Sequence, residues 1–218
     1  MFRLFMGALA ALTFAASSRA AIVQGQDYIM LSPPQPTEPG KKVEVIEFFA
    51  YYSPHCNVLD PGLTEWVKAR GDSIVFKRVH LSANGEPTAQ QRLYYALKAM
   101  GQADQYQAKI FHAMHVEHVR VNTNADAISL AVKLGFDRAK FTAFYNSFTV
   151  QTKVQRALQM MTNYQISSWP TLIVDGKYVT SPPVAAARMG SNDSEQVAIA
   201  LMLKVMDELV DQQLKTRH

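Results

Sequence analysis

A nearly continuous apolar run, VEVIEFFAYY at residues 43–52, constrains the fold more than any other part of the sequence. Its length is typical of a strand buried on both faces. Pro54 follows almost at once, and proline suits the first turn of a helix because a missing N–H costs nothing there. The segment therefore predicts a buried strand, followed by a helix that begins at SPHC, residues 53–56. The apolar stripe expected on that helix comprises Leu59, Leu63 and Trp66, with a kink at Pro61.

The SPHC motif has the spacing of a Cys-x-x-Cys pair, but its first position is Ser53 and Cys56 is the only cysteine of the chain. A helix N-terminus stabilises negative charge, so a thiolate at position 53 would be favoured there. The Ser53 hydroxyl stays protonated near neutral pH, and its simpler role is to cap the helix. Cys56 is either a small buried hydrophobe or the remaining half of a redox pair.

The rest of the chain alternates strand signals with a helical block. Residues 73–81 predict a second strand, and residues 171–179 predict a hairpin turning at Asp175-Gly176. Between about 87 and 161 apolar residues recur only at helical spacings. A last helix is expected to begin at a capping pair formed by Asn192 and Glu195. Its expected apolar face comprises Val197, Leu201, Val205 and Leu209.

Residues 1–20 have the form of an export signal. Arg3 precedes an apolar core, and Ser18-Arg19-Ala20 ends in a small-x-small cleavage pattern. The core is shorter than the roughly 20 residues that span a bilayer. Without this segment the formal net charge falls from +4 to +2, because two arginines and no acids leave. No run of Lys and Arg remains, so no nucleic-acid partner is expected.

The order strand, helix, strand, helical block, hairpin, helix predicts an α/β chain with a thioredoxin-like fold and an inserted helical subdomain. EFFAYYSPHC, residues 47–56, resembles the Glu-Phe-Phe-x-aromatic-aromatic-Cys-Pro-His-Cys segment of the DsbA family of periplasmic thiol:disulfide oxidoreductases. WPTLIVDGKY, residues 169–178, resembles the family's cis-proline loop. The division expected is a signal peptide at 1–20, a thioredoxin-like domain at 21–86 and 150–218, and an inserted helical domain at 87–149.

The resemblance implies a role for each matching position. Ser53 falls on the attacking cysteine, and Cys56 falls on the buried resolving cysteine. Glu47 falls on a buried acid near the resolving thiol, with Lys77 as its basic partner. Pro170 falls on the cis-proline, and a substrate groove is expected around Trp169, Pro170 and Tyr52. The remaining residues of the catalytic motif are Pro54 and His55.

Ser53 is the chain's departure from the family pattern. Disulfide exchange needs a thiolate that attacks sulfur and later leaves again, and a hydroxyl takes no part in it. The sequence therefore predicts a DsbA-type oxidoreductase that introduces disulfides into exported proteins, with its dithiol exchange disabled as written. Two alternatives stay open: a peptide-binding module without chemistry, and a glutathione-dependent transferase or isomerase that uses Ser53 to steady the thiolate of glutathione.

The resemblance also implies partners and a location. The expected location is the periplasm, the expected substrates are reduced or unfolded exported proteins, and the expected reoxidant is a membrane protein of DsbB type. We expect a monomer that uses no cofactor. His112, His115 and His118 are spaced three apart on one expected helix, but no carboxylate completes a metal set with them, and no metal is expected.

Overall fold

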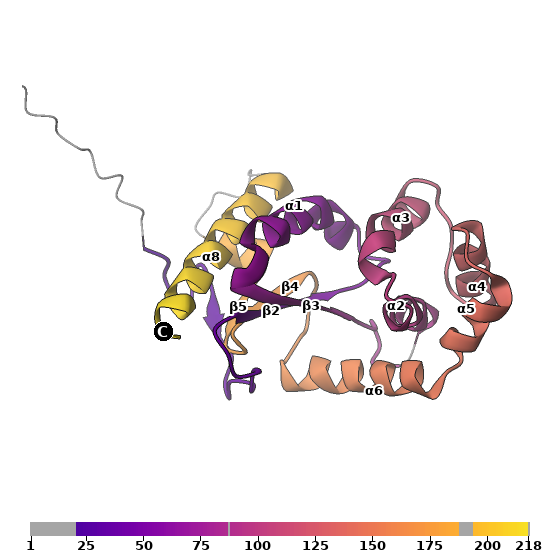
Figure 1. The fold of residues 1–218 in the computed structure, drawn as a ribbon. Coiled ribbons are helices and arrows are strands. Elements are labelled where there is room, and N and C mark those ends of the chain that lie inside the picture. The colour runs from indigo at the N-terminus through magenta and orange to yellow at the C-terminus, as the bar shows by residue number, and fades with distance from the viewer. Residues whose placement is uncertain (1–20, 87, 188–193, 218) are drawn as a thin grey trace, which may run out of the picture.

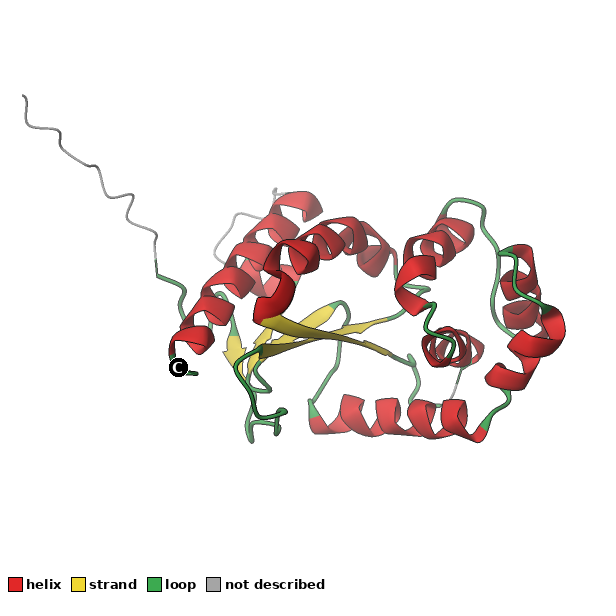
Figure 2. Ribbon diagram, viewed as in Figure 1, coloured by secondary structure: helices red, strands yellow, loops and turns green. Residues whose placement is uncertain are grey.

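A five-stranded sheet lies at the centre of the molecule, with strand order β1-β5-β4-β2-β3 (Figure 2). Neighbouring strands β2 and β3 are parallel, and the other neighbouring pairs are antiparallel. The computed structural model describes residues 21–86, 88–187 and 194–217. The strands are β1 (Ile29–Met30), β2 (Val43–Phe49), β3 (Ile74–His80), β4 (Thr171–Val174) and β5 (Tyr178–Thr180).

Helices cover the sheet from both sides and extend beyond it. In Figure 1, α1 and α8 lie over one face, α6 runs beneath the opposite face, and α2 to α5 form a block at one end. The helices are α1 (Pro54–Arg70), α2 (Ala89–Ala99), α3 (Ala103–His115), α4 (Asn124–Lys133), α5 (Arg138–Tyr145), α6 (Phe148–Asn163), α7 (Pro182–Ala185) and α8 (Glu195–Lys215), with a 3-10 turn at Gly71–Ser73.

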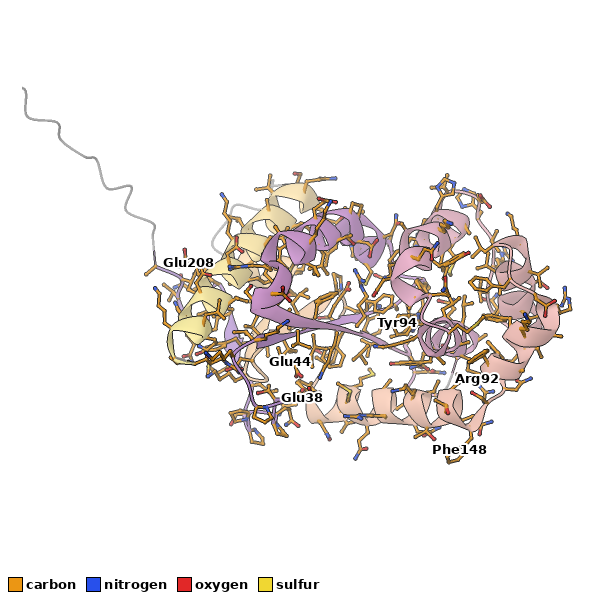
Figure 3. The ribbon with its side chains drawn as sticks, in the orientation of Figure 1. Glu38, Glu44, Arg92, Tyr94, Phe148 and Glu208 are labelled. Carbon is orange, nitrogen blue, oxygen red and sulfur yellow. The ribbon has the colours of Figure 1, made fainter. Side chains whose placement is uncertain are left out.

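The two faces of the sheet belong to two separate apolar cores, because successive strand residues point to opposite sides. Val43 and Val45 of β2 pack in one core with α1 and α8. Ile46 and Phe48 pack in the other core with residues of the helical insertion. Figure 3 shows Tyr94 of α2 inside this second core, whereas Phe148 points outward from the start of α6. Strand β2, which lies between β4 and β3 and is buried at all seven positions, therefore connects the two layers.

Most elements expected from the sequence are present. The second strand, the hairpin turning at Asp175-Gly176 and the succession of helices between residues 89 and 163 are confirmed. The first strand is shorter than the apolar run at residues 43–52, because it ends at Phe49. A turn follows, in which the Ser53 amide donates to the Ala50 carbonyl at 3.1 Å. The division at residues 87 and 150 stays a prediction, and α6 runs across residue 150.

The last helix differs from expectation at its start and on its buried face. Ser194 caps α8 by accepting from the Val197 amide, and Asn192 lies outside the described residues. Val205 and Leu209 of the expected face are buried, but the Val197 side chain is exposed. The buried face is centred on Met202, Met206 and Leu209. Residues four apart advance by more than one 3.6-residue turn, so a face read at strict four-residue spacing rotates away from the core.

None of the helices within the described ranges is both long and apolar enough to cross a bilayer.

Candidate functional site

The SPHC motif forms the first turn of α1, directly after the end of β2. Ser53 is the N-cap residue, and its Oγ accepts from the Cys56 amide at 3.3 Å. Pro54 occupies the first helical position, where it forfeits no hydrogen bond. Ser53 is only 4% exposed. The expected capping role of Ser53 is therefore confirmed, and position 53 lies at the positive end of a 17-residue helix.

Cys56 lies one turn inside α1, and none of its surface is exposed. Burial, together with the nearby Glu47 carboxyl, raises the pKa of its thiol to about 12. A hydrogen bond with the Ser53 side chain acts in the opposite direction. The buried position expected from the sequence is confirmed. Cys56 is therefore a protonated thiol near neutral pH and a poor nucleophile.

Glu47 is fully buried in β2, as expected, but its basic partner is Arg78. Arg78 Nε donates to Glu47 Oε2 at 2.7 Å. The two residues face each other in the register of β2 and β3. Burial raises the pKa of Glu47 to about 7, although the Arg78 guanidinium lowers it. The same carboxylate raises the pKa of Arg78.

Lys77 was the wrong choice of partner by one residue. Because neighbouring strand residues point to opposite faces, Lys77 faces away from Glu47. Its Nζ lies 2.7 Å from a Glu44 oxygen and 2.9 Å from a Glu38 oxygen. Figure 3 shows Glu44 and Glu38 below the sheet, on the side of α6. Lys77 therefore belongs to a structural ion pair outside the site.

Asp60, the residue before the expected kink at Pro61, also belongs to the site. It is buried, and Arg78 Nη2 donates to its Oδ1 at 3.4 Å. Burial raises the pKa of Asp60, and Arg78 lowers it. Asp60 follows Cys56 by four residues on α1, and this spacing places both side chains on one helical face. That spacing, with the position of Arg78 opposite Glu47, is the sequence signal for the cluster of Glu47, Asp60 and Arg78.

The cis-proline loop meets the same end of β2. The Trp169-Pro170 bond is cis, as expected. Thr171, the next residue, pairs with Phe48 in the antiparallel β2–β4 ladder, so Pro170 lies beside the end of β2 that leads into the motif. The Trp169 ring meets the Tyr52 ring edge-on, with 6.0 Å between centroids. Pro170 is buried and Trp169 is half-buried.

His55 points outward from the motif, and its side chain is 65% exposed. Its Nδ1 lies 2.6 Å from Glu195 Oε1, at the first residue of α8. No local sequence pattern predicts this contact, because 140 residues separate the two positions. The imidazole is therefore held at the rim of the motif by a carboxylate from the last helix.

The three histidines separate at the end of α3. His115 is the last residue of that helix, and its Nε2 lies 2.7 Å from the Tyr51 carbonyl oxygen. His112 lies 3.6 Å from Glu117, and His118 follows the helix with a positive φ of 56°. In the described part of the chain, no group of three or more His, Cys, Asp or Glu side chains could hold a metal ion.

Together these residues form a helix N-terminus with a hydroxyl at the capping position, a buried thiol behind it and an aromatic wall beside it. The single cysteine cannot form an internal disulfide. The Ser53 hydroxyl cannot exchange with sulfur. Among the described residues, the site therefore offers no accessible thiolate.

Residues 44–202 match the family described as a DSBA-like thioredoxin domain. A thiol:disulfide interchange protein DsbA of Bordetella parapertussis is 39% identical over 209 residues, which are 95% of this chain and 94% of the relative. The crystal structure of Pseudomonas aeruginosa DsbA is 26% identical and covers 88% of this chain and 94% of its own, with a TM-score of 0.74. A Proteus mirabilis DsbA with a non-covalently bound peptide has the same fold, with a TM-score of 0.70 at 24% identity over 88% of this chain and 100% of its own. The expected thioredoxin-like α/β fold, with α2 to α6 inserted between strands, is confirmed.

Proposed function

Because this chain belongs to the DsbA-like thioredoxin family of thiol:disulfide interchange proteins, we propose that it is a scaffold for disulfide exchange with exported polypeptides in which Ser53 disables the dithiol cycle. The observation that carries this proposal is the position of Ser53 at the N-cap of α1, one turn before the buried thiol of Cys56. The helix N-terminus would stabilise a thiolate at position 53, whereas a hydroxyl there only caps the helix.

The exchange that the scaffold serves needs two thiols. A substrate thiolate attacks one sulfur of the protein disulfide, forms a mixed disulfide and releases the second protein sulfur as a thiolate. The other substrate thiolate then attacks the mixed disulfide, so two electrons pass from the substrate dithiol to the protein. With Ser53 there is no disulfide to attack, and the first step does not occur.

The residues around the motif keep features that suit a peptide ligand. Tyr52 and Trp169 offer an aromatic surface, and the buried Pro170 leads into β4 beside the motif. We propose that Tyr52, Trp169 and Pro170 contact the substrate chain, and that Pro54, His55, Cys56 and Glu47 complete the reactive centre with position 53. The DsbA of known structure that holds a peptide without a covalent bond is an example of such binding on this fold.

The same proposal includes a location and partners. We propose export to the periplasm through the signal at residues 1–20, which lie outside the described residues. The substrates are reduced or unfolded exported proteins, and a DsbB-type membrane protein is the reoxidant of a dithiol form. The chain acts as a monomer without a cofactor.

A peptide-binding module without chemistry is the second candidate. The observation that favours it is that the aromatic surface at Tyr52 and Trp169 coexists with a thiol that is fully buried. Such a module would bind unfolded chains and slow their aggregation. It would transfer no disulfide, even after a thiol is supplied at position 53.

Ser53→Cys separates these candidates. The new thiol is expected to close a disulfide with Cys56 and to have a pKa well below the free value of about 8.5, because the helix N-terminus favours its thiolate. The oxidised variant is expected to transfer its disulfide to a reduced, unfolded protein. Acid-quenched thiol trapping measures the transfer, and ultraviolet absorbance at 240 nm measures the thiolate.

Two controls accompany this experiment. The parent chain and the double variant Ser53→Cys with Cys56→Ala are both expected to be inactive as disulfide donors, since each has a single thiol. If Ser53→Cys folds but forms no internal disulfide, or if the parent transfers disulfides equally fast, the proposed exchange function is wrong. If the disulfide forms but no substrate is oxidised, the binding module is favoured.

A further inference from the structure

A cavity of about 490 Å³ lies beside the motif, on the side of the helical insertion. Tyr52, the residue before Ser53, lines it from the motif side, and Gln90 lines it from α2. His115, His118 and Arg120 line it from the end of α3 and the loop that follows. Helix α3 contacts α1 in the structure, and Figure 1 shows the two side by side. We call this space the Tyr52–Arg120 cavity.

Two residues that line this cavity each carry a buried polar atom with no hydrogen-bond partner among the described residues. These atoms are the Tyr52 hydroxyl and Gln90 Oε1. The Gln90 amide is held in place, because its Nε2 donates to the Val121 carbonyl at 3.2 Å. Leaving a buried polar group without a partner is unfavourable. A hydroxyl that can donate and an amide oxygen that can accept match the C=O and N–H of a peptide backbone.

The rim of the cavity carries positive charge without a matching carboxylate. Arg120 is exposed, and the structure gives it no ion pair with any described residue. The nearest acidic residue in the loop, Glu117, is already engaged by Lys133 and by His112. His118 reaches the rim through a left-handed backbone conformation, which histidine adopts more readily than most residues. The Arg120 guanidinium is therefore available to pair with a carboxylate of a ligand.

We propose that the Tyr52–Arg120 cavity is a specificity subsite in which the substrate chain lies against Tyr52 and Gln90 and an acidic side chain near the reactive cysteine is selected through Arg120. This inference rests on the proposed function and adds a preference to it. The Tyr52 ring separates the cavity from Trp169, so a peptide that reaches the motif can extend on either side of Tyr52. The acidic preference applies only to the side that enters the cavity.

The test uses the oxidised Ser53→Cys variant and short reduced peptides with one cysteine. In each peptide, one of the three positions on either side of the cysteine is Asp or Lys. We expect the Asp peptide to react about fivefold faster than its Lys counterpart on one side of the cysteine only, as an ion pair near 1 kcal/mol implies. Stopped-flow fluorescence measures the rates.

Three further variants are made in the Ser53→Cys background. Arg120→Glu is expected to reverse the preference. Arg138→Glu, an exposed arginine at the start of α5, makes the same change of net charge and is expected to keep it. Tyr52→Phe is expected to change the rates of Asp and Lys peptides alike, because it alters the lining of the cavity and leaves the charge.

The outcomes separate the two proposals. Equal rates for Asp and Lys peptides at every position overturn the subsite proposal. The proposal is also overturned if Arg120→Glu shows the same preference as the Ser53→Cys variant without it. In both cases disulfide transfer itself stands. A preference lost equally in Arg138→Glu also overturns it, because net charge then explains the effect. If no peptide and no unfolded protein is oxidised, the proposed exchange function fails first, and the subsite fails with it.

Discussion

Burial keeps the Cys56 thiol protonated and out of contact with solvent. Cys56 lies in the first turn of α1 with no exposed surface, and burial raises the pKa of its thiol to about 12. We expect maleimide to label the folded chain roughly a hundredfold or more slowly than the chain in denaturant, because only the thiolate reacts. Mass spectrometry over a time course measures both rates. The control is Ser167→Cys with Cys56→Ala, whose exposed thiol should label quickly while folded. Rapid labelling of Cys56 in the folded chain would contradict its burial.

Glu47 makes the stability of the fold depend on pH. Its folded pKa of about 7 lies above its ordinary value of 4.5, so the folded state holds a proton that the unfolded state has released in this range. The contribution of Glu47 to the free energy of unfolding is therefore fully present below about pH 4.5. It declines by up to about 3 kcal/mol as the pH rises toward 7. Glu47→Gln is expected to remove this decline and to be more stable than the parent at pH 8, since the amide oxygen can still accept from Arg78.

Urea unfolding of parent and Glu47→Gln at pH 5, 6, 7 and 8 measures the effect. The matched control is Glu65→Gln, an exposed residue of α1 whose replacement should leave the pH curve in place. Parallel curves for the parent and Glu47→Gln would show that the buried carboxyl does not titrate in this range.

At the scale of elements, the β4–β5 turn is held by the extended segment that contains Gln35. Gly176 has a φ of +65°, and its carbonyl accepts from the Gln35 amide at 2.8 Å. A Cβ at this position would lie 2.2 Å from the Gln35 carbonyl oxygen, a distance that the backbone cannot tolerate. The turn residue is therefore required by close approach as well as by its conformation.

Gly176→Ala is expected to destabilise the fold by several kcal/mol, because backbone strain and a steric clash act together. Gly101→Ala is the matched control, since Gly101 has a φ of +70° and open space where its Cβ would be. That control should cost only about 1 to 2 kcal/mol. Thermal unfolding followed by circular dichroism compares the two. Equal losses would mean that the Gln35 segment moves aside freely.

Local signals in the sequence predicted the elements well and their contacts less well. Proline at the first helical position, the Asp175-Gly176 turn and the apolar repeats act over a few residues, and they determined where elements occur. The pairing of Glu47 with Arg78 depends on strand register, and the contact of His55 with Glu195 spans the whole fold. Such contacts require the arrangement of elements in space, which no short pattern contains. The burial of Cys56 and Glu47 was predicted from the resemblance to the family, which implies a buried resolving cysteine and a buried acid at these positions.

At the scale of the whole molecule, the helical insertion and the sheet share one core. Phe49 at the end of β2 contacts the rings of Tyr94 in α2 and Phe111 in α3. The Tyr94 hydroxyl also donates to the Arg78 carbonyl at 3.0 Å, on the outer side of β3. The other core, with Trp66 and α8, lies across the same sheet. Because β2 contributes to both cores, loss of either removes support from the other.

We therefore expect the insertion and the thioredoxin-like part to unfold in one cooperative transition. Leu130→Ala removes a buried side chain of α4, far from Trp66, and should cost about 2 to 5 kcal/mol. In a Trp169→Phe background Trp66 is the only tryptophan, so its fluorescence reports the core on the opposite face. Leu130→Ala should lower the Trp66 midpoint and the helical circular dichroism midpoint equally. A Trp66 midpoint that stays in place while the helical signal shifts would show instead that the insertion unfolds alone, as an independent domain.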